Sequence, residues 1–193
     1  AANPFVFGSF IGIISGYIGG LFDNIVMRIV DVFLAFPSLV LAIAVAGVLG
    51  GGMINAMIAI GVIGWTKYAR LARGEVLEIK EETFIKAARL SGNSSMYIVF
   101  KHIMPRVLST LIVTASLDIG TTIMEMAALS FLGLSSPLPI PEWGAMMNEG
   151  KSMIQFAPWI TIAPGIAIFI IVILFNLLGD VVHDMLDPKQ KEY

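Results

Sequence analysis

The chain has 193 residues, of which 57% are hydrophobic and only 13% are charged. A soluble globular domain carries about 25% charged residues, so this composition is typical of a chain solvated by lipid. The sequence contains no cysteine, which excludes a disulfide framework, thiolate metal sites and a cysteine nucleophile. The first residues also lack the basic segment that opens a signal peptide.

The first half of the sequence predicts three membrane spans. A helix needs about 20 apolar residues to cross a bilayer. No charged residue lies between Pro4 and Phe22, and none lies between Val32 and Thr66. The second run is too long for one span and has three consecutive glycines at its middle, so we expect two spans joined by a tight turn. The three predicted spans are 4–22, 32–49 and 53–72.

The second half predicts two further spans. A polar segment, 73–106, precedes a fourth span at 107–129, and a fifth span is expected at 158–179. Between them, 130–157 is rich in proline and cannot form a long helix before Pro141, so we expect a loop with one short helix. The prediction is an all-α, polytopic membrane protein, with five transmembrane helices in a single domain (1–193).

The basic residues fall almost entirely on one side of these spans. Five spans place the loops on alternating sides, and the positive-inside rule makes the basic side cytoplasmic. Segment 73–106 and the C-terminus are then cytoplasmic, and the glycine turn and 130–157 are external. The N-terminus falls outside, so we expect one earlier span before residue 1. Lys151 is external; the cytoplasmic basic residues are Arg28, Lys67, Arg70, Arg73, Lys80, Lys86, Arg89, Lys101, Arg106, Lys189 and Lys191.

The polar segment reads as two short helices that break at Gly92. Glycine takes the left-handed conformation that ends a helix, and Asn93 or Ser94 is suited to begin the next one. Pro105 then opens the fourth span, where its missing N–H costs little. Two sets of residues recur at i, i+3, i+4 and i+7: Phe84, Ala87, Ala88 and Ser91 in the first helix, and Met96, Val99, Phe100 and Ile103 in the second.

Each set predicts one helix face, with Lys86 and Arg89 pointing elsewhere. The small residues of the first face would let a partner surface approach closely, as when a helix docks into a groove. The alternative is an amphipathic helix pair that rests on the lipid surface.

The spacing of this segment resembles the EAA loop of ABC-importer permeases. In that family the loop forms a coupling helix that docks into a groove of the cytoplasmic ATPase. Lys86 stands where the family has glutamate, so the contacts of that glutamate are not carried over; His102 and Met104 replace an isoleucine and a leucine. The matching positions are Ala87, Ala88, Gly92 and Pro105.

The resemblance extends along the chain. Segments 27–45, 64–77, 128–150 and 175–189 are similar to the inner-membrane permeases of the dipeptide, oligopeptide and nickel subfamily. Such permeases have six spans, of which this chain looks like the second to sixth. The resemblance implies a multi-pass protein of a prokaryotic cytoplasmic membrane that imports peptides or, second, nickel. The coupling residues it implies are Phe84, Ala87, Ala88, Arg89, Gly92, Met96 and Pro105.

The resemblance also implies the partners. A homologous permease would complete a heterodimer, two cytoplasmic ATPase subunits would bind ATP and Mg²⁺, and an external solute-binding protein would deliver the cargo. The chain itself is expected to bind no cofactor and to catalyse no reaction, because the phosphate-binding pattern G-x-x-x-x-G-K-[ST] is absent from the sequence. No basic stripe with interleaved aromatic residues indicates nucleic-acid binding.

Two acids fall within the fourth predicted span, where an ionised carboxylate costs roughly 2.5–3.5 kcal/mol. Asp118 and Glu125 are seven residues apart, and Thr121 and Thr122 lie between them. One interpretation is a translocation path lined by Asp118, Thr122 and Glu125. The other is interhelical hydrogen bonding, or a carboxyl that burial keeps neutral.

The external loop carries Glu142 and Trp143, which the resemblance places where a solute-binding protein docks. The alternative is a passive interfacial loop anchored by Trp143 and Trp159. The eleven methionines suggest soft-metal binding but also serve as apolar filler. His102 and His183 show no ligand pattern, and we expect no metal site.

Two other classes of protein are alternatives to the importer. An ion-coupled secondary transporter would use the intramembrane acids, but the sequence shows no inverted repeat. A membrane-embedded enzyme would need a catalytic constellation such as H-E-x-x-H, which the sequence lacks.

Overall fold

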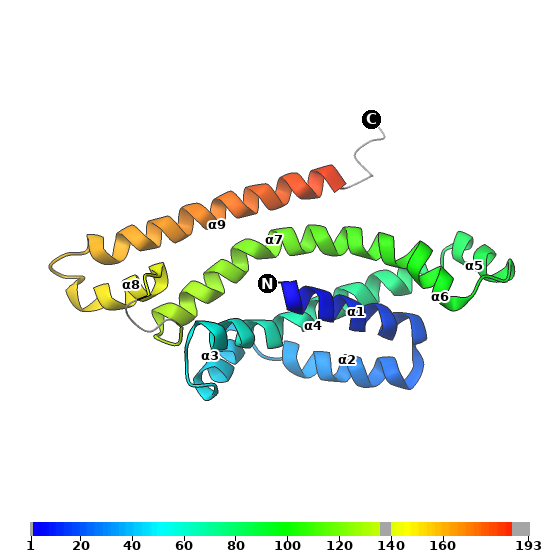
Figure 1. Cartoon of the computed structure of the whole chain (residues 1–193), viewed down its shortest axis with the longest axis horizontal. Coiled ribbons are helices and arrows are strands. Elements are labelled where there is room, and N and C mark those ends of the chain that lie inside the picture. Colours follow the sequence, from blue (N-terminus) through cyan, green and yellow to red (C-terminus); the bar gives the residue numbers. More distant parts are fainter. Residues whose placement is uncertain (1, 136–139, 187–193) are drawn as a thin grey trace. The chain divides into compact units, whose positions relative to one another are not determined.

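The computed structural model describes residues 2–135 and 140–186, and within them all regular structure is helical (Figure 1). This confirms the prediction of an all-α fold. Lys189 and Lys191, predicted to be cytoplasmic, lie outside the described residues, as do Pro137 and Pro139 of the predicted external loop. The helices are α1 (Ala2–Ile18), α2 (Gly20–Leu34), α3 (Ser38–Val48), α4 (Met53–Ile79), α5 (Thr83–Leu90), α6 (Ser95–Ile98), α7 (Met104–Phe131), α8 (Trp143–Gly150) and α9 (Trp159–Leu186), with a π-helical turn at Val99–Ile103 and a 3₁₀ turn at Lys151–Met153.

The chain divides into two compact units. One, the α1–α2 unit, contains residues 2–36 and 64–113; the other, the α8–α9 unit, contains residues 37–63 and 114–186. The long helices α4 and α7 each contribute one part to each unit.

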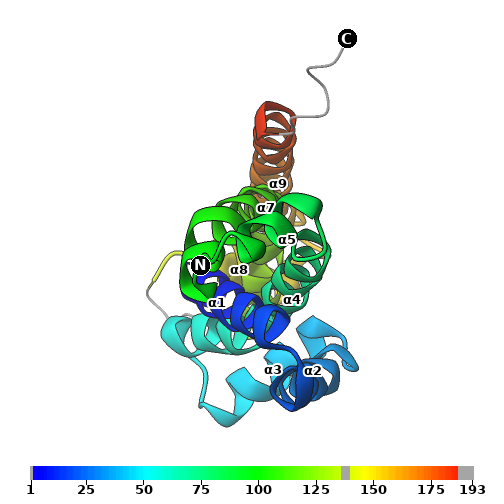
Figure 2. The same cartoon turned by 90° about the vertical axis from the view of Figure 1, so that its right-hand side faces the viewer.

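In the α1–α2 unit, α1 packs closely along α4 (Figures 1 and 2). Gly8, Gly12 and Gly16 recur every four residues and form one face of α1. A Cβ added at Gly8 or Gly12 would lie within 3.0 Å of main-chain atoms of Trp65 or Ala69. Only glycine therefore lets the two backbones approach this closely, as in the small-residue interfaces of membrane helices. We call this contact the α1–α4 seam.

In the α8–α9 unit, small side chains again form the core. α8 packs against α9 (Figure 1). At Gly144, a Cβ would overlap the main chain of Ala127 in α7. The main cluster of buried residues consists of Ala42, Ala46, Ala56, Ala59, Ile63 and Leu129.

Within residues 2–135 and 140–186, two helical runs are long and apolar enough to cross a membrane, Ser95–Phe131 and Trp159–Met185. They contain or overlap the predicted spans 107–129 and 158–179. A third candidate is the pair formed by α2 and α3, which a short break separates. α1 is apolar but has only 17 residues, and the total of five spans stays a prediction.

The break between α2 and α3 differs from the sequence prediction of an unbroken span at 32–49. The predicted span 32–49 is interrupted, because α2 ends at Leu34 and α3 begins at Ser38. Pro37 explains the break, since it lacks an N–H and disfavours helical geometry at Phe36. The acids Asp23 and Asp31 then lie within α2 rather than in a loop between spans.

Candidate functional site

The candidate site is the segment from α5 to the π-helical turn, residues 83–103, which we call the coupling segment. α5 ends as predicted: Gly92 has a φ of +79°, and its N–H donates to the carbonyl of Arg89. Ser94 then caps α6, because its hydroxyl accepts from the N–H of Tyr97 at 3.3 Å. Asn93 instead donates back to the carbonyl of Ala88 at 3.1 Å. The predicted break at Gly92 is confirmed.

The π-helical turn, Val99–Ile103, follows from Pro105. The proline cannot donate to the carbonyl of Lys101, and its ring would clash with that carbonyl in a regular α-helix. The N–H of Met104 donates to the carbonyl of Val99, five residues back. The helical run thereby continues into α7 instead of starting at Pro105.

The extra residue in this turn shifts the faces of the second helix. Met96 and Phe100 are 68% and 54% exposed, whereas Ile103 is fully buried. The prediction that these residues share one face with Val99 is therefore wrong at Ile103. A pattern of 3.6 residues per turn does not hold across a π-helical turn.

Internal contacts hold the coupling segment to the chain. Ile85 is fully buried. Arg106 lies over the ring of Phe84, with the guanidinium carbon 4.9 Å from the centroid, and donates from Nη1 to Oε1 of Glu82 at 2.8 Å. His102 meets Phe84 edge to face at 6.1 Å. Phe84, predicted as part of a docking face, is thus partly engaged within the chain, and His102 packs as a structural residue.

Two further contacts join this region to α1. Arg89 lies 5.8 Å from the ring centroid of Tyr17, and Nζ of Lys80 donates to the carbonyl of Gly16 at 3.2 Å. Both connect residues far apart in sequence, so spacing alone gave no signal for them. Together they tie α5, and the turn before it, to the end of α1.

Lys86, which stands in place of the family glutamate, pairs with Glu81. Its Nζ lies 3.1 Å from Oε2 of Glu81, and this cation lowers the pKa of the Glu81 carboxyl. Both side chains are more than half exposed, so the pair adds little stability.

Several apolar side chains of the coupling segment are open to the surroundings, although Ile98 is buried. Leu90 is 90% exposed, and Met96, Tyr97 and Phe100 are also exposed. Ala87 is exposed and Ala88 is half-buried. A surface of this kind is suited to burial against a partner, because exposed apolar clusters commonly mark interaction sites.

A partly buried ion pair fastens α2 to α4. Arg73 donates from Nε and Nη2 to the two oxygens of Asp23 at 2.7 and 2.6 Å, and the hydroxyl of Ser15 donates to Oδ1 at 2.5 Å. We call Ser15, Asp23 and Arg73 the clasp. Sequence analysis missed it, although an acid on the inner face of an apolar helix was a usable signal.

The path candidates of the fourth predicted span all lie in α7. The hydroxyls of Thr121 and Thr122 donate to the main-chain carbonyl of Asp118. Glu125 accepts from the hydroxyl of Ser38 in α3 at 2.9 Å. For Glu125, the structure therefore contains the interhelical hydrogen bond that sequence analysis gave as the alternative to a path-lining role.

Glu142 and Trp143 lie at the start of α8. Glu142 accepts from the hydroxyls of Ser130 and Ser135. Trp143 is 43% exposed, and Trp159 at the start of α9 is 65% exposed. The carboxylate is thus held within the chain, and the two indoles are the accessible groups. Among the described residues, no group of three or more His, Cys, Asp or Glu is placed to hold a metal ion.

Comparison with known proteins defines the class. Residues 8–192 match the family described as "Binding-protein-dependent transport system inner membrane component". The chain therefore belongs to this family of membrane transport components.

Two similar proteins are permeases named for dipeptide and glutathione transport. The chain is 45% identical over 186 residues to a dipeptide transport system permease protein of Alkalihalophilus pseudofirmus, covering 96% of this chain and 61% of that protein. It is 46% identical over 184 residues to a glutathione transport system permease protein of Pectobacterium atrosepticum, covering 95% and 61%. The chain thus spans about three-fifths of the length of these relatives.

A solved structure shows the same fold. An inward-facing form of the MetNI methionine ABC transporter matches with a TM-score of 0.65 at 19% identity, covering 95% of this chain and 93% of that one. At this identity the likeness concerns the fold alone.

Proposed function

We propose that the chain is a permease subunit of an ATP-binding-cassette importer that moves peptides across the cytoplasmic membrane. Family membership supports the transport role, and the relatives named for dipeptide and glutathione transport favour a peptide-class cargo over nickel. Membership of a binding-protein-dependent family also counts against an ion-coupled secondary transporter.

The coupling segment carries the proposal. It presents exposed apolar residues and is held to the chain by Ile85, by Arg106 and by the contact of Arg89 with Tyr17. A segment that is open on one side and anchored on the other transmits a partner's movement to the helices behind it. We assign the open side to a cytoplasmic ATPase subunit.

The partners follow from this assignment. Two ATPase subunits bind ATP and Mg²⁺, a homologous permease forms the other half of a heterodimer, and an external solute-binding protein delivers cargo near Trp143. Segment 73–106 and the C-terminus lie in the cytoplasm, as the distribution of basic residues indicates. Asp118, Thr122 and Glu125 are proposed to lie along the cargo path.

The mechanism needs two states that the ATPase distinguishes. ATP binding shifts the populations only if the coupling segment makes different contacts in the inward-facing and outward-facing states. The buried anchor at Ile85 keeps α5 from sliding when the ATPase subunits close, so their closure moves α1 and α7 with it.

The test is a substitution that blocks docking without changing the fold. Ala87→Trp adds bulk at an exposed position of α5. We expect ATP-driven uptake by the reconstituted importer to fall at least about tenfold, since a bulky side chain at the centre of an interface disrupts its packing. Ala163→Trp, at an exposed alanine of α9, is the matched control and should leave uptake near wild type. Unchanged uptake in Ala87→Trp, with an intact complex, would refute the assignment.

A further inference from the structure

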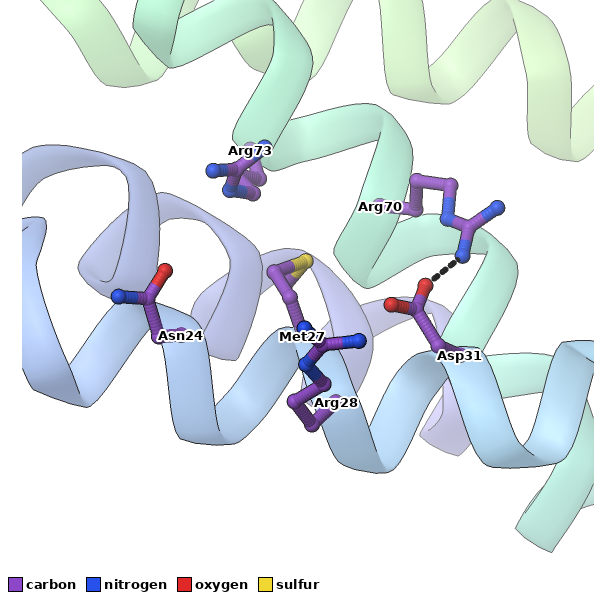
Figure 3. Close-up of a pocket in the computed structure, with 6 residues that line it drawn as sticks. All are labelled: Asn24, Met27, Arg28, Asp31, Arg70 and Arg73. Carbon is purple, nitrogen blue, oxygen red and sulfur yellow. Dashed lines mark hydrogen bonds and ion pairs between the residues drawn. The ribbon is translucent and has the colours of Figure 1, made fainter.

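A basic groove lies between α2 and α4 in the α1–α2 unit. Its volume is about 490 Å³. Figure 3 shows its lining: Arg70 and Arg73 come from α4, and the remaining four side chains come from α2. The lining residues are Asn24, Met27, Arg28, Asp31, Arg70 and Arg73.

The groove carries one guanidinium that no acid neutralises. Arg73 is held by Asp23, and Arg70 forms an ion pair with Asp31. Arg28 is exposed and forms no ion pair with any residue in the described parts of the chain. The three guanidinium groups therefore outnumber the two carboxylates that pair with them, those of Asp23 and Asp31. Each guanidinium also has five N–H donors, more than one carboxylate occupies.

An apolar stripe borders the groove on α2. Its members recur at i, i+4, i+8 and i+11 and are 80%, 62%, 48% and 63% exposed: Leu21, Ile25, Ile29 and Val32. At 100° per residue, Arg28 lies between this stripe and the groove. Helix α2 thus presents an exposed apolar surface next to Arg28, and arginine is a side chain that binds phosphate.

We propose that the groove binds the phosphate-bearing headgroup of an anionic phospholipid, with an acyl chain lying along the apolar stripe. Arginine binds phosphate through paired N–H donors, which suits the groove to a phosphodiester. The proposal rests on the predicted membrane orientation, in which Arg28, Arg70 and Arg73 lie on the cytoplasmic side. Anionic lipids of that leaflet attract basic groups there. A free phosphate ion would use the arginines but leave the stripe uncovered.

The test measures lipid binding to the purified importer complex. Native mass spectrometry would compare phosphatidylglycerol with the zwitterionic lipid phosphatidylcholine, with and without excess inorganic phosphate. The variants are Arg28→Gln, Arg28→Lys and Ile25→Gln, and Lys151→Gln is the control because it removes an exposed cation that does not line the groove. The melting temperature of each complex confirms that it is folded.

We expect phosphatidylglycerol to bind in preference to phosphatidylcholine and to resist displacement by phosphate. Arg28→Gln should weaken phosphatidylglycerol binding about fivefold, as expected for the loss of one basic residue near a membrane surface. Arg28→Lys should retain most of it, Ile25→Gln should weaken it, and Lys151→Gln should not change it.

Three results would overturn the proposal. They are equal binding of the two lipids, wild-type binding by Arg28→Gln, and displacement by inorganic phosphate, which would make the groove an ion site. Loss of the partner permease from the Arg28→Gln complex would also overturn it, because the stripe would then be a protein interface. None of these measurements depends on ATP-driven uptake, so they are separate from the test of the transport role.

Discussion

The α1–α4 seam and the coupling segment belong to one unit of the molecule but differ in what covers them. In the seam, Gly12 and Ala69 bring two backbones into contact, and the clasp of Asp23 and Arg73 lies beside it. In the coupling segment, Leu90 remains almost wholly exposed. The seam is completed by the chain itself, whereas the coupling segment leaves apolar side chains open, as its proposed docking to an ATPase subunit requires.

This difference predicts that the seam determines stability and that the coupling segment determines transport. Lipid supplies no hydrophobic driving force between helices, so the seam depends on van der Waals contact and hydrogen bonding. Substitutions there should lower the stability of the permease. Substitutions on the open side of the coupling segment should leave stability unchanged and reduce transport.

The largest effect is expected from Gly12→Leu. The new side chain would overlap the main chain of Ala69 and the Cβ of Ala72, and overpacking of this kind costs about 3 kcal/mol. Thermal unfolding of the purified complex in detergent would measure the loss. Gly74→Leu is the control, because nothing lies within 4 Å of a Cβ at Gly74; it should be neutral or gain up to about 1 kcal/mol from helix propensity. Equal melting temperatures for the two variants would refute the seam.

Asp23→Asn should have the next largest effect. It leaves the partly buried Arg73 without its charged partner, which costs about 2 kcal/mol once the 31% exposure of Arg73 is allowed for. The control is Asp31→Asn: its ion pair with Arg70 is about half exposed on both sides and should contribute less than about 1 kcal/mol. A cost for Asp31→Asn equal to that for Asp23→Asn would contradict the account of the clasp.

Arg106→Gln should have the smallest effect on stability. It removes a half-exposed ion pair with Glu82 and a cation–π contact with Phe84, which together are worth about 1 kcal/mol. Uptake should fall about two- to threefold if these contacts only steady the coupling segment. Wild-type uptake would show that Arg106 is not an anchor.

Local rules account for what the sequence predicted well. The break at Gly92 and the cap by Ser94 depend on a few neighbouring residues, and the structure has both. Pro37 and Pro105 were visible in the sequence, but their consequences depend on the surrounding helix. Pro37 breaks the helix between α2 and α3, and Pro105 produces a π-helical turn in a helix that continues.

Contacts between distant residues were harder to predict. The glycines of α1 follow a period of four, which was a usable sign of a close helix contact, but nothing in the sequence identified α4 as the partner. Likewise, Asp23 and Arg73 are 50 residues apart, and their pairing depends on how α2 and α4 pack. The Glu125–Ser38 hydrogen bond, over 87 residues, is of the same kind.

The most direct measurement of the central claim uses the absence of cysteine from this chain. A single Leu90→Cys thiol would be cross-linked in the assembled importer, with Ile140→Cys, exposed in the 130–157 loop, as the control. The account predicts that the cysteine at 90 joins to the ATPase subunit and that the cysteine at 140 does not. A residue 90 thiol that reacts only with lipid-embedded or external reagents would contradict it.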